Sequence, residues 1–248
     1  DTTINATPLT YSAVYKIDMV SANHQINNAK VKRILPNTAF DFNRPDREYT
    51  GVAVFYDNSY FIARKGPKNS NPIDPDNAIL RFRQKEKSNG EIVDTLLGRV
   101  PLLAPEGTGI LSINGATSIT SFNRRNYDII VTLAGDNSFK VQWLEFVQSA
   151  DFTGYQSKLQ PFASDMLNVG KFARPEDSAI DDAGNIYVAD AEKDSIYKFN
   201  NFGDQLQAFG GEELFDQPYA VAFFDRTLYV LDTNNDRILR FILSTEID

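Results

Sequence analysis

The chain has 248 residues, 42% of them hydrophobic and 23% charged, which excludes wholesale disorder, and no apolar run approaches the roughly 20 residues that span a bilayer. A formal net charge of −8 argues against a dominant basic surface, so no nucleic acid partner is expected. The absence of cysteine excludes disulfides and thiolate metal sites, and a single histidine, His24, excludes zinc sites that need several histidines.

The first part of the chain alternates strand-forming segments with turns. β-Branched and aromatic residues favour strands, whereas Gly, Asn, Asp and Pro favour the turns between them. The predicted strands are 12–20, 30–35, 51–55, 60–63, 77–82, 91–98, 118–122, 127–133, 139–146 and 154–159. Three longer segments interrupt the rhythm: 65–76, 101–115 and 160–170.

A repeat organises the last third of the chain. Residues Tyr187, Asp190, Ile196 and Phe199 recur 42 positions later as Tyr229, Asp232, Ile238 and Phe241. The first of these units predicts strands at 178–181, 186–189, 195–199 and 205–209. A period of about 40–45 residues with several short strands per unit is typical of a β-propeller blade.

These patterns predict an all-β fold, a single β-propeller domain over residues 1–248 built from four-stranded blades. The clearest blades are 172–213 and 215–243. Counting strands favours five blades. The last unit has no clear fourth strand, so we expect an N-terminal strand to complete it and close the ring.

The last two units resemble the NHL repeat. The resemblance rests on Pro175, on residues 184–190 with the sequence Gly-Asn-Ile-Tyr-Val-Ala-Asp, and on the related run 228–241. The first half matches loosely, because Arg64 stands where the repeat has its strand-ending aspartate. NHL propellers are usually six-bladed, so the resemblance favours six blades where the strand count favours five.

The NHL family implies fold more strongly than function. It includes ligand-binding and protein-interaction modules, RNA binders of the tripartite-motif class, an amidating lyase and extracytoplasmic bacterial proteins. The lyase's histidine-based zinc chemistry does not carry over to a chain whose one histidine lies in a polar turn. Arg124-Arg125 and residues 30–33 are the local basic clusters, and we interpret them as turn and edge charges.

Two groups of polar residues are singled out. Asp190 and Asp232, which recur with the repeat, are expected to cap turns. Residues that enter the inner strands differ from blade to blade and are expected to line the mouth of the central channel, where a ligand binds. These candidate ligand-binding residues are Arg44, Asp46, Arg47, Tyr49, Arg174, Glu176, Asp177, Gln217 and Tyr219.

Metal binding has weak support. Asp74 and Asp76 in the segment 71–77 offer oxygen ligands for calcium but lack the full spacing of an EF-hand loop. No cofactor is otherwise predicted. Trp143 is expected to pack between blades.

The sequence therefore predicts a non-catalytic propeller that binds an unknown protein, peptide or glycan. No catalytic residue is assigned, because nucleophile motifs, phosphate loops and dinucleotide fingerprints are absent. The alternative is a calcium-dependent hydrolase or lactonase with its site in the central channel. The polar start of the chain favours a bacterial protein with an export signal removed, extracytoplasmic in the periplasm or anchored at the surface.

Overall fold

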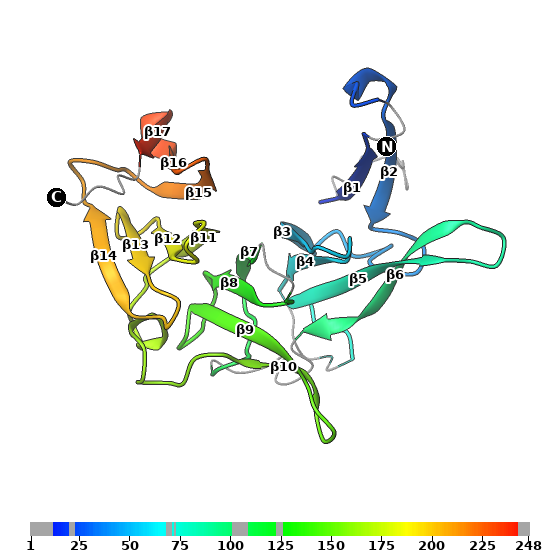
Figure 1. The fold of residues 1–248 in the computed structure, drawn as a ribbon, viewed down its shortest axis with the longest axis horizontal. Coiled ribbons are helices and arrows are strands. Elements are labelled where there is room, and N and C mark those ends of the chain that lie inside the picture. The colour runs from blue at the N-terminus through cyan, green and yellow to red at the C-terminus, as the bar shows by residue number, and fades with distance from the viewer. Residues whose placement is uncertain are drawn as a thin grey trace.

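The computed structural model describes residues 12–19, 23–67, 71, 73–100, 109–122 and 126–242. Within these residues the fold is all-β, with five antiparallel sheets that follow one another along the chain (Figure 1). The first sheet pairs β1 (Val14–Asp18) with β2 (Lys30–Leu35). The second contains β3 (Glu48–Val54), β4 (Tyr60–Lys65), β5 (Ala78–Glu86) and β6 (Ile92–Val100).

The remaining sheets follow the same antiparallel order. The third contains β7 (Ala116–Ser121), β8 (Ile129–Leu133), β9 (Val141–Gln148) and β10 (Thr153–Ser157). The fourth contains β11 (Pro175–Ile180), β12 (Ile186–Asp190), β13 (Ser195–Phe199) and β14 (Gln205–Gly210). The last contains β15 (Pro218–Phe224), β16 (Thr227–Asp232) and β17 (Arg237–Ile242). Three single-turn 3-10 helices lie at Ile26–Asn28, Asp165–Leu167 and Thr233–Asn235.

The first strand of each larger sheet lies on the inside of an arc. β3 contacts β7, β7 contacts β11, and β11 contacts β15, as the curved order of the sheets in Figure 1 shows. Side-chain hydroxyls join neighbouring inner strands: Thr50 Oγ1 donates to the Ala116 carbonyl at 2.7 Å, and Thr117 Oγ1 donates to the Pro175 carbonyl at 2.9 Å. This arrangement confirms the predicted β-propeller.

The cores lie between successive sheets. Phe61 and Ile129 belong to the core between the β3–β6 and β7–β10 sheets. Trp143 and Val188 belong to the next core, and Leu228 to the one after it. Trp143 stacks on Phe122 with ring centroids 4.8 Å apart, which confirms its predicted packing role. Each central sheet therefore buries apolar side chains on both faces.

The ends of the arc differ from the prediction. Five sheets agree with the strand count, but the last one has three strands in the described residues, with β17 at its edge. The expected N-terminal strand does not join it there: β1 pairs with β2, and residues 1–11 lie outside the described residues. The described residues therefore do not show a ring closed by an N-terminal strand. The two ends of the arc stay apart in Figure 1.

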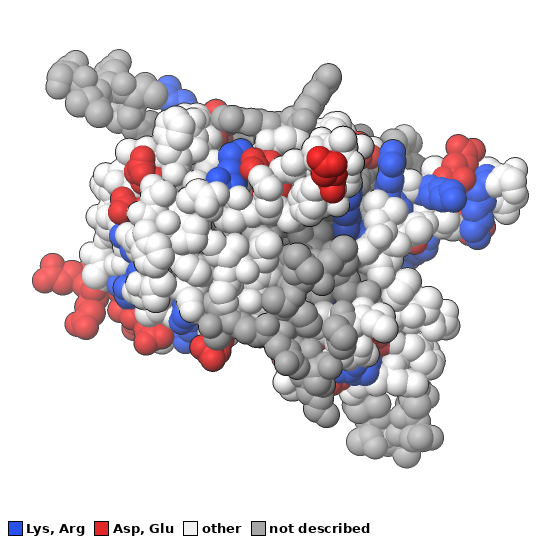
Figure 2. Space-filling view, turned by 90° about the horizontal axis from the view of Figure 1, so that it is seen from below, with Lys and Arg blue, Asp and Glu red and all other residues white. Residues whose placement is uncertain are grey.

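The β5–β6 hairpin projects from the arc because its strands continue past the core (Figure 1). The predicted strand 77–82 stops at the last buried residue, Phe82, whereas pairing runs on to Glu86 opposite Ile92. Lys87 and Glu91 form an ion pair of 3.0 Å at its tip. Figure 2 shows acidic and basic side chains interspersed on this hairpin.

One face of the last sheet exposes apolar side chains and has no neighbouring sheet in the described part of the chain. Cross-strand pairing places Leu231 opposite Ile238 and Thr227 opposite Ile242, so these side chains share a face. Ile238 is 67% exposed and Ile242 is 70% exposed, whereas Leu239 on the opposite face packs into the core. Among the described residues, no sheet packs on this face, on which Arg240 lies between the two isoleucines.

We predict that this face binds the dye ANS in the native state, because Ile238 and Ile242 expose apolar surface on either side of Arg240. The double substitution Ile238→Thr and Ile242→Thr keeps β-branched residues. It should lower the dye's fluorescence and leave the melting temperature nearly unchanged. The matched change Leu239→Thr, on the packed face, should instead lower stability by about 1–2 kcal/mol. Equal effects of the two variants on melting would contradict the assignment of faces.

Candidate functional site

A shared irregularity shapes one end of the propeller. Each of the four inner strands has a β-bulge at the same step of its pairing, and the extra residues are Thr50, Thr117, Glu176 and Tyr219. A bulge bends the strand and redirects its side chains. The bulges lie where the inner strands begin, so they place two threonines, a glutamate and a tyrosine at this end, which we call the bulge end.

The bulge end of β11 and β15 carries a polar cluster. Arg174 Nη2 donates to Gln217 Oε1 at 2.9 Å, and Arg174 Nε lies 3.1 Å from Glu176 Oε1. Burial raises the pKa of Glu176 above its usual value, although Arg174 and a hydrogen bond with Tyr219 favour the ionised form. The Glu176 side chain is 6% exposed, whereas Tyr219 is 47% exposed. The structure therefore brings together four predicted site residues from adjacent blades.

Asp177 lies beside this cluster but within the wall. Its Oδ1 accepts a hydrogen bond from Ser118 Oγ at 2.5 Å, and its Oδ2 accepts one from the Val221 backbone N–H at 3.0 Å. Burial raises the pKa of Asp177, while these hydrogen bonds favour its ionised form. Its carboxylate joins β7, β11 and β15, so its contacts are structural.

The predicted residues near β3 belong to an ion network that is buried at Arg47, Arg64, Asp41 and Asp76 and about one third exposed at Arg44, Asp46 and Asp74. Its charged members, all from the β2–β3 loop, β4 and the β4–β5 loop, are Asp41, Arg44, Asp46, Arg47, Arg64, Asp74 and Asp76. Arg47 and Arg64 have side chains only 1% and 2% exposed. Tyr49 donates its hydroxyl to Asp41 Oδ2 at 2.6 Å.

Arg64 replaces a recurrent aspartate with the opposite charge. The register pairs Asp190 with Pro175, Asp232 with Pro218, and Arg64 with Tyr49. Asp190 accepts the N–H groups of Ala173 and Arg174 at 2.7 and 2.9 Å, and Asp232 accepts that of Asp216 at 2.7 Å. As predicted, these carboxylates accept backbone N–H groups, but the donors belong to the loop that enters the blade and not to the turn that follows each aspartate.

In the β3–β6 sheet the end of the second strand is also bonded to the incoming loop, but here the strand-end side chain is the donor. Arg64 donates from Nη1 to Asp41 Oδ1 at 2.8 Å and from Nη2 to the Pro75 carbonyl at 2.6 Å. Arg47 completes the network with a bond of 2.9 Å to Asp76. The substitution at the repeat position is therefore compensated within the same blade.

Asp74 and Asp76, the weak calcium candidates, face arginines. Arg47 and Arg64 both bond Asp74, at 2.9 and 3.0 Å, and Arg44 and Arg47 bond Asp76. Across the described ranges, no group of three or more acidic or histidine side chains is arranged to hold a metal ion. His24 is exposed in a turn with φ of 59°.

A cavity of about 560 Å³ adjoins the bulge end between the β3–β6 and β7–β10 sheets. Asp46, Glu48 and Lys65 supply its charges, and Lys65 Nζ lies 3.0 Å from Glu48 Oε2. Lys65 also acts electrostatically on Glu176 and Tyr219. Lys65 was missed in the sequence, although its place directly after Arg64, at the end of a second strand, could have marked it.

The described residues contain no helix long and apolar enough to cross a membrane. Arg124 and Arg125 of the predicted basic cluster lie outside the described residues. On the face seen in Figure 2, basic side chains are interspersed with acidic ones, with no continuous basic stripe.

Comparison with known proteins identifies the fold. No family model matches the chain, and no curated protein matches it by sequence. A luciferin-regenerating enzyme is similar in structure, with a TM-score of 0.51 at 14% identity over 81% of this chain and 58% of that one. Regucalcin, a calcium-binding protein from Agrobacterium tumefaciens, matches with a TM-score of 0.50 at 12% identity over 77% of this chain and 55% of its own. The chain spans somewhat over half the length of these β-propeller proteins, and at such identities the likeness shows the fold alone.

We predict that Arg64→Leu destabilises the protein by about 3–5 kcal/mol, because it leaves the buried Asp41 carboxylate without its strand-end partner. Urea unfolding measures the change. Arg83→Leu on the exposed side of β5 is the control and should change stability by about 0.5 kcal/mol or less. Similar losses in the two variants would contradict a specific role for the network.

The network also predicts a pH dependence. Burial opposes ionisation of Asp74, but hydrogen bonds from Arg47 and Arg64 outweigh it and lower the pKa of Asp74 from 3.8 to about 2. A depressed pKa stabilises the folded state above the unfolded value, and this contribution is lost as pH falls through the folded value. Between pH 4 and pH 2 the melting temperature of the wild type should therefore fall more than that of Asp74→Asn. Parallel curves would contradict the ion pairing.

Proposed function

We propose that the protein is a non-catalytic binding module whose ligand docks at the bulge end, over Arg174, Glu176, Gln217 and Tyr219. These predicted site residues come together from two adjacent blades, with Tyr219 exposed and Arg174 partly exposed. A carboxylate, a guanidinium, an amide and a phenol together offer donors and acceptors beside an aromatic face. That set suits the hydroxyls of a glycan or the backbone and side chains of a peptide segment.

The burial of Glu176 is the observation that carries the proposal. A carboxylate that is 6% exposed with a raised pKa lowers stability at neutral pH, since burial disfavours its charge. Its cation, Arg174, is itself 36% exposed and offers incomplete compensation. A residue that is unfavourable for the fold and lies beside an exposed aromatic ring is a functional candidate.

The finer parts of the proposal rest on the sequence. We propose an NHL-like, bacterial and extracytoplasmic protein because residues 184–190 and 228–241 resemble that repeat. Fractionation of the source cells, with N-terminal sequencing of the native protein, tests the export proposal. The calcium-dependent hydrolase alternative is tested by adding Ca²⁺: a rise in melting temperature that survives dialysis would favour it.

We predict that Glu176→Gln raises the melting temperature at pH 7 and removes a pH dependence. Because the folded pKa is raised, the wild type should lose stability as pH rises above the unfolded value of 4.5. Gln has the same shape without the charge, so this slope should flatten. Identical slopes in the two proteins would contradict the burial of the charge.

The same variant tests the function. Defined glycan and peptide arrays would be probed with the wild type, Glu176→Gln, Tyr219→Ala and the control Arg240→Ala, whose side chain is exposed on β17. The first two variants should weaken binding of any hit by about tenfold or more, as central contacts in interfaces do. Arg240→Ala should bind as the wild type does. Hits that bind all variants equally would overturn the proposed site.

A further inference from the structure

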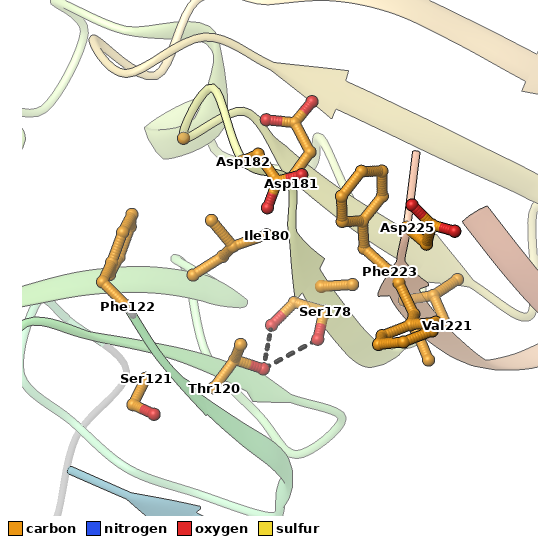
Figure 3. A pocket seen from close by; sticks show the side chains of 14 residues that line it. Thr120, Ser121, Phe122, Ser178, Ile180, Asp181, Asp182, Val221, Phe223 and Asp225 are labelled. Carbon is orange, nitrogen blue, oxygen red and sulfur yellow. Dashed lines mark hydrogen bonds between the residues drawn. The ribbon is translucent and has the colours of Figure 1, made fainter. Parts of the chain in front are cut away.

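A second cavity opens at the other end of the inner strands. It has a volume of about 700 Å³ and is lined by the last residues of β7, β11 and β15 and the turns that follow them (Figure 3). Because the bulge end lies where these strands begin, the two sites are separated by the length of the strands. A substitution that tests one site is therefore expected to leave ligand binding at the other site unchanged.

One part of the wall of this cavity is apolar and aromatic. Phe122, Ile180 and Phe223 come from the three different blades and surround it in Figure 3. Phe122 is held by stacking on Trp143, with ring centroids 4.8 Å apart, and Phe223 packs against the core between the last two sheets. The aromatic faces are therefore supported by the cores behind them, which keeps the cavity in one shape.

The inner side of the cavity is polar but uncharged. Thr120 Oγ1 donates to the Ser178 carbonyl at 2.7 Å and lies 2.8 Å from Ser178 Oγ, as the dashed lines in Figure 3 mark. These bonds tie β7 to β11. The two hydroxyl oxygens retain acceptor capacity toward a ligand, since a hydroxyl has two lone pairs.

Among the described residues that line the cavity, the charges are all negative. Asp181, Asp182 and Asp225 are the ionisable groups of this described lining, which holds no lysine or arginine. Asp181 is committed to its own turn: it accepts hydrogen bonds from the Ala183 and Asn185 backbone N–H groups and from Tyr187 Oη.

Asp182 and Asp225 differ from Asp181. Both are exposed, and in the part of the chain that the structure describes neither carboxylate makes an ion pair or side-chain hydrogen bond. Arg226 follows Asp225 in the chain but does not line the cavity. Two uncommitted carboxylates therefore stand at the edge of an aromatic cavity.

We propose that this cavity binds an organic cation, a protonated amine that carries an aryl or alkyl body. The body would fill the apolar space between Phe122, Ile180 and Phe223. The ammonium group would pair with Asp182 and Asp225 and lie near the face of Phe223, where ring electrons attract cations. Anions are disfavoured by the same carboxylates, and uncharged molecules forgo the electrostatic attraction.

Phenethylamine, its uncharged analogue phenethyl alcohol and the anion 3-phenylpropanoate are the probes, with binding measured by calorimetry and ligand-observed NMR at low salt. The amine should bind about tenfold more tightly than the alcohol, from two partly exposed ion pairs of modest strength, and the anion more weakly still. Added salt should weaken binding of the amine. Equal binding of all three probes, or preference for the anion, would overturn the proposal.

Asp182→Asn and Asp225→Asn each remove one charge while keeping the shape, and Asn tolerates the positive φ of 45° at position 225. Each should weaken amine binding about three- to tenfold, without changing the melting temperature. Asp151→Asn, which removes an exposed charge at the β9–β10 turn, is the control and should bind as the wild type does. An equal loss in all three variants would mean general electrostatic attraction and would overturn the site.

A peptide acetyl-Gly-Phe-Lys-Gly-amide distinguishes the source of the cation. Preference for the free amine would identify a small-molecule ligand. Preference for the peptide, with the same dependence on Asp182 and Asp225, would support the same chemistry supplied by a lysine side chain. Phe223→Leu keeps the apolar volume and should weaken either cation several-fold more than it weakens the alcohol.

Discussion

The whole structure depends on sheets that are apolar on both faces. A strand places alternate side chains on opposite faces, and in β12 and β8 both sets are buried. Such a sheet is stable only with a neighbour on each side, so the sheets stack around an axis and their first strands gather there. The same requirement makes the outer face of β15–β17 unusual, because its apolar residues have no neighbour in the described part of the chain.

Each blade must also join the end of its second strand to the loop that enters the blade. The chain does this with an acidic side chain in two blades and with a basic one in the β3–β6 sheet. Asp190 and Asp232 receive backbone N–H groups, whereas Arg64 supplies donors to Asp41 and to backbone carbonyls. A buried arginine requires more partners than a buried aspartate, since its five donors must all be satisfied. The extra acids of the β4–β5 loop meet that need, which explains why a loop rich in aspartate holds arginines there.

The repeat made the blades predictable, because the period and the turn residues can be read locally, whereas the donors that Asp190 and Asp232 accept lie about 16 residues earlier in the chain. The partner of Arg64 was not predictable, since it depends on the path of the loop that brings Asp41 back to the strand end. The bulge at Glu176 was hidden for a similar reason: it shifts the alternation by one residue, so that Glu176 faces the mouth and Asp177 enters the wall. The cavity beyond β11 needs three blades to form, and no single unit encodes it.

The carboxylates of the inner blades can be sorted by how completely the protein satisfies them. Asp190 has two backbone donors and serves the fold, and Asp177 joins three strands. Glu176 is ion-paired with one partly exposed cation, and its burial outweighs the help of Arg174, Tyr219 and Lys65, so we look for a reason outside the fold for its presence. A buried carboxylate lowers stability when hydrogen bonds and cations do not fully offset its loss of hydration, and exposed carboxylates at the edge of a cavity add no stability. Function is therefore sought where the hydrogen bonding of an acid is incomplete, at the two ends of the same inner strands.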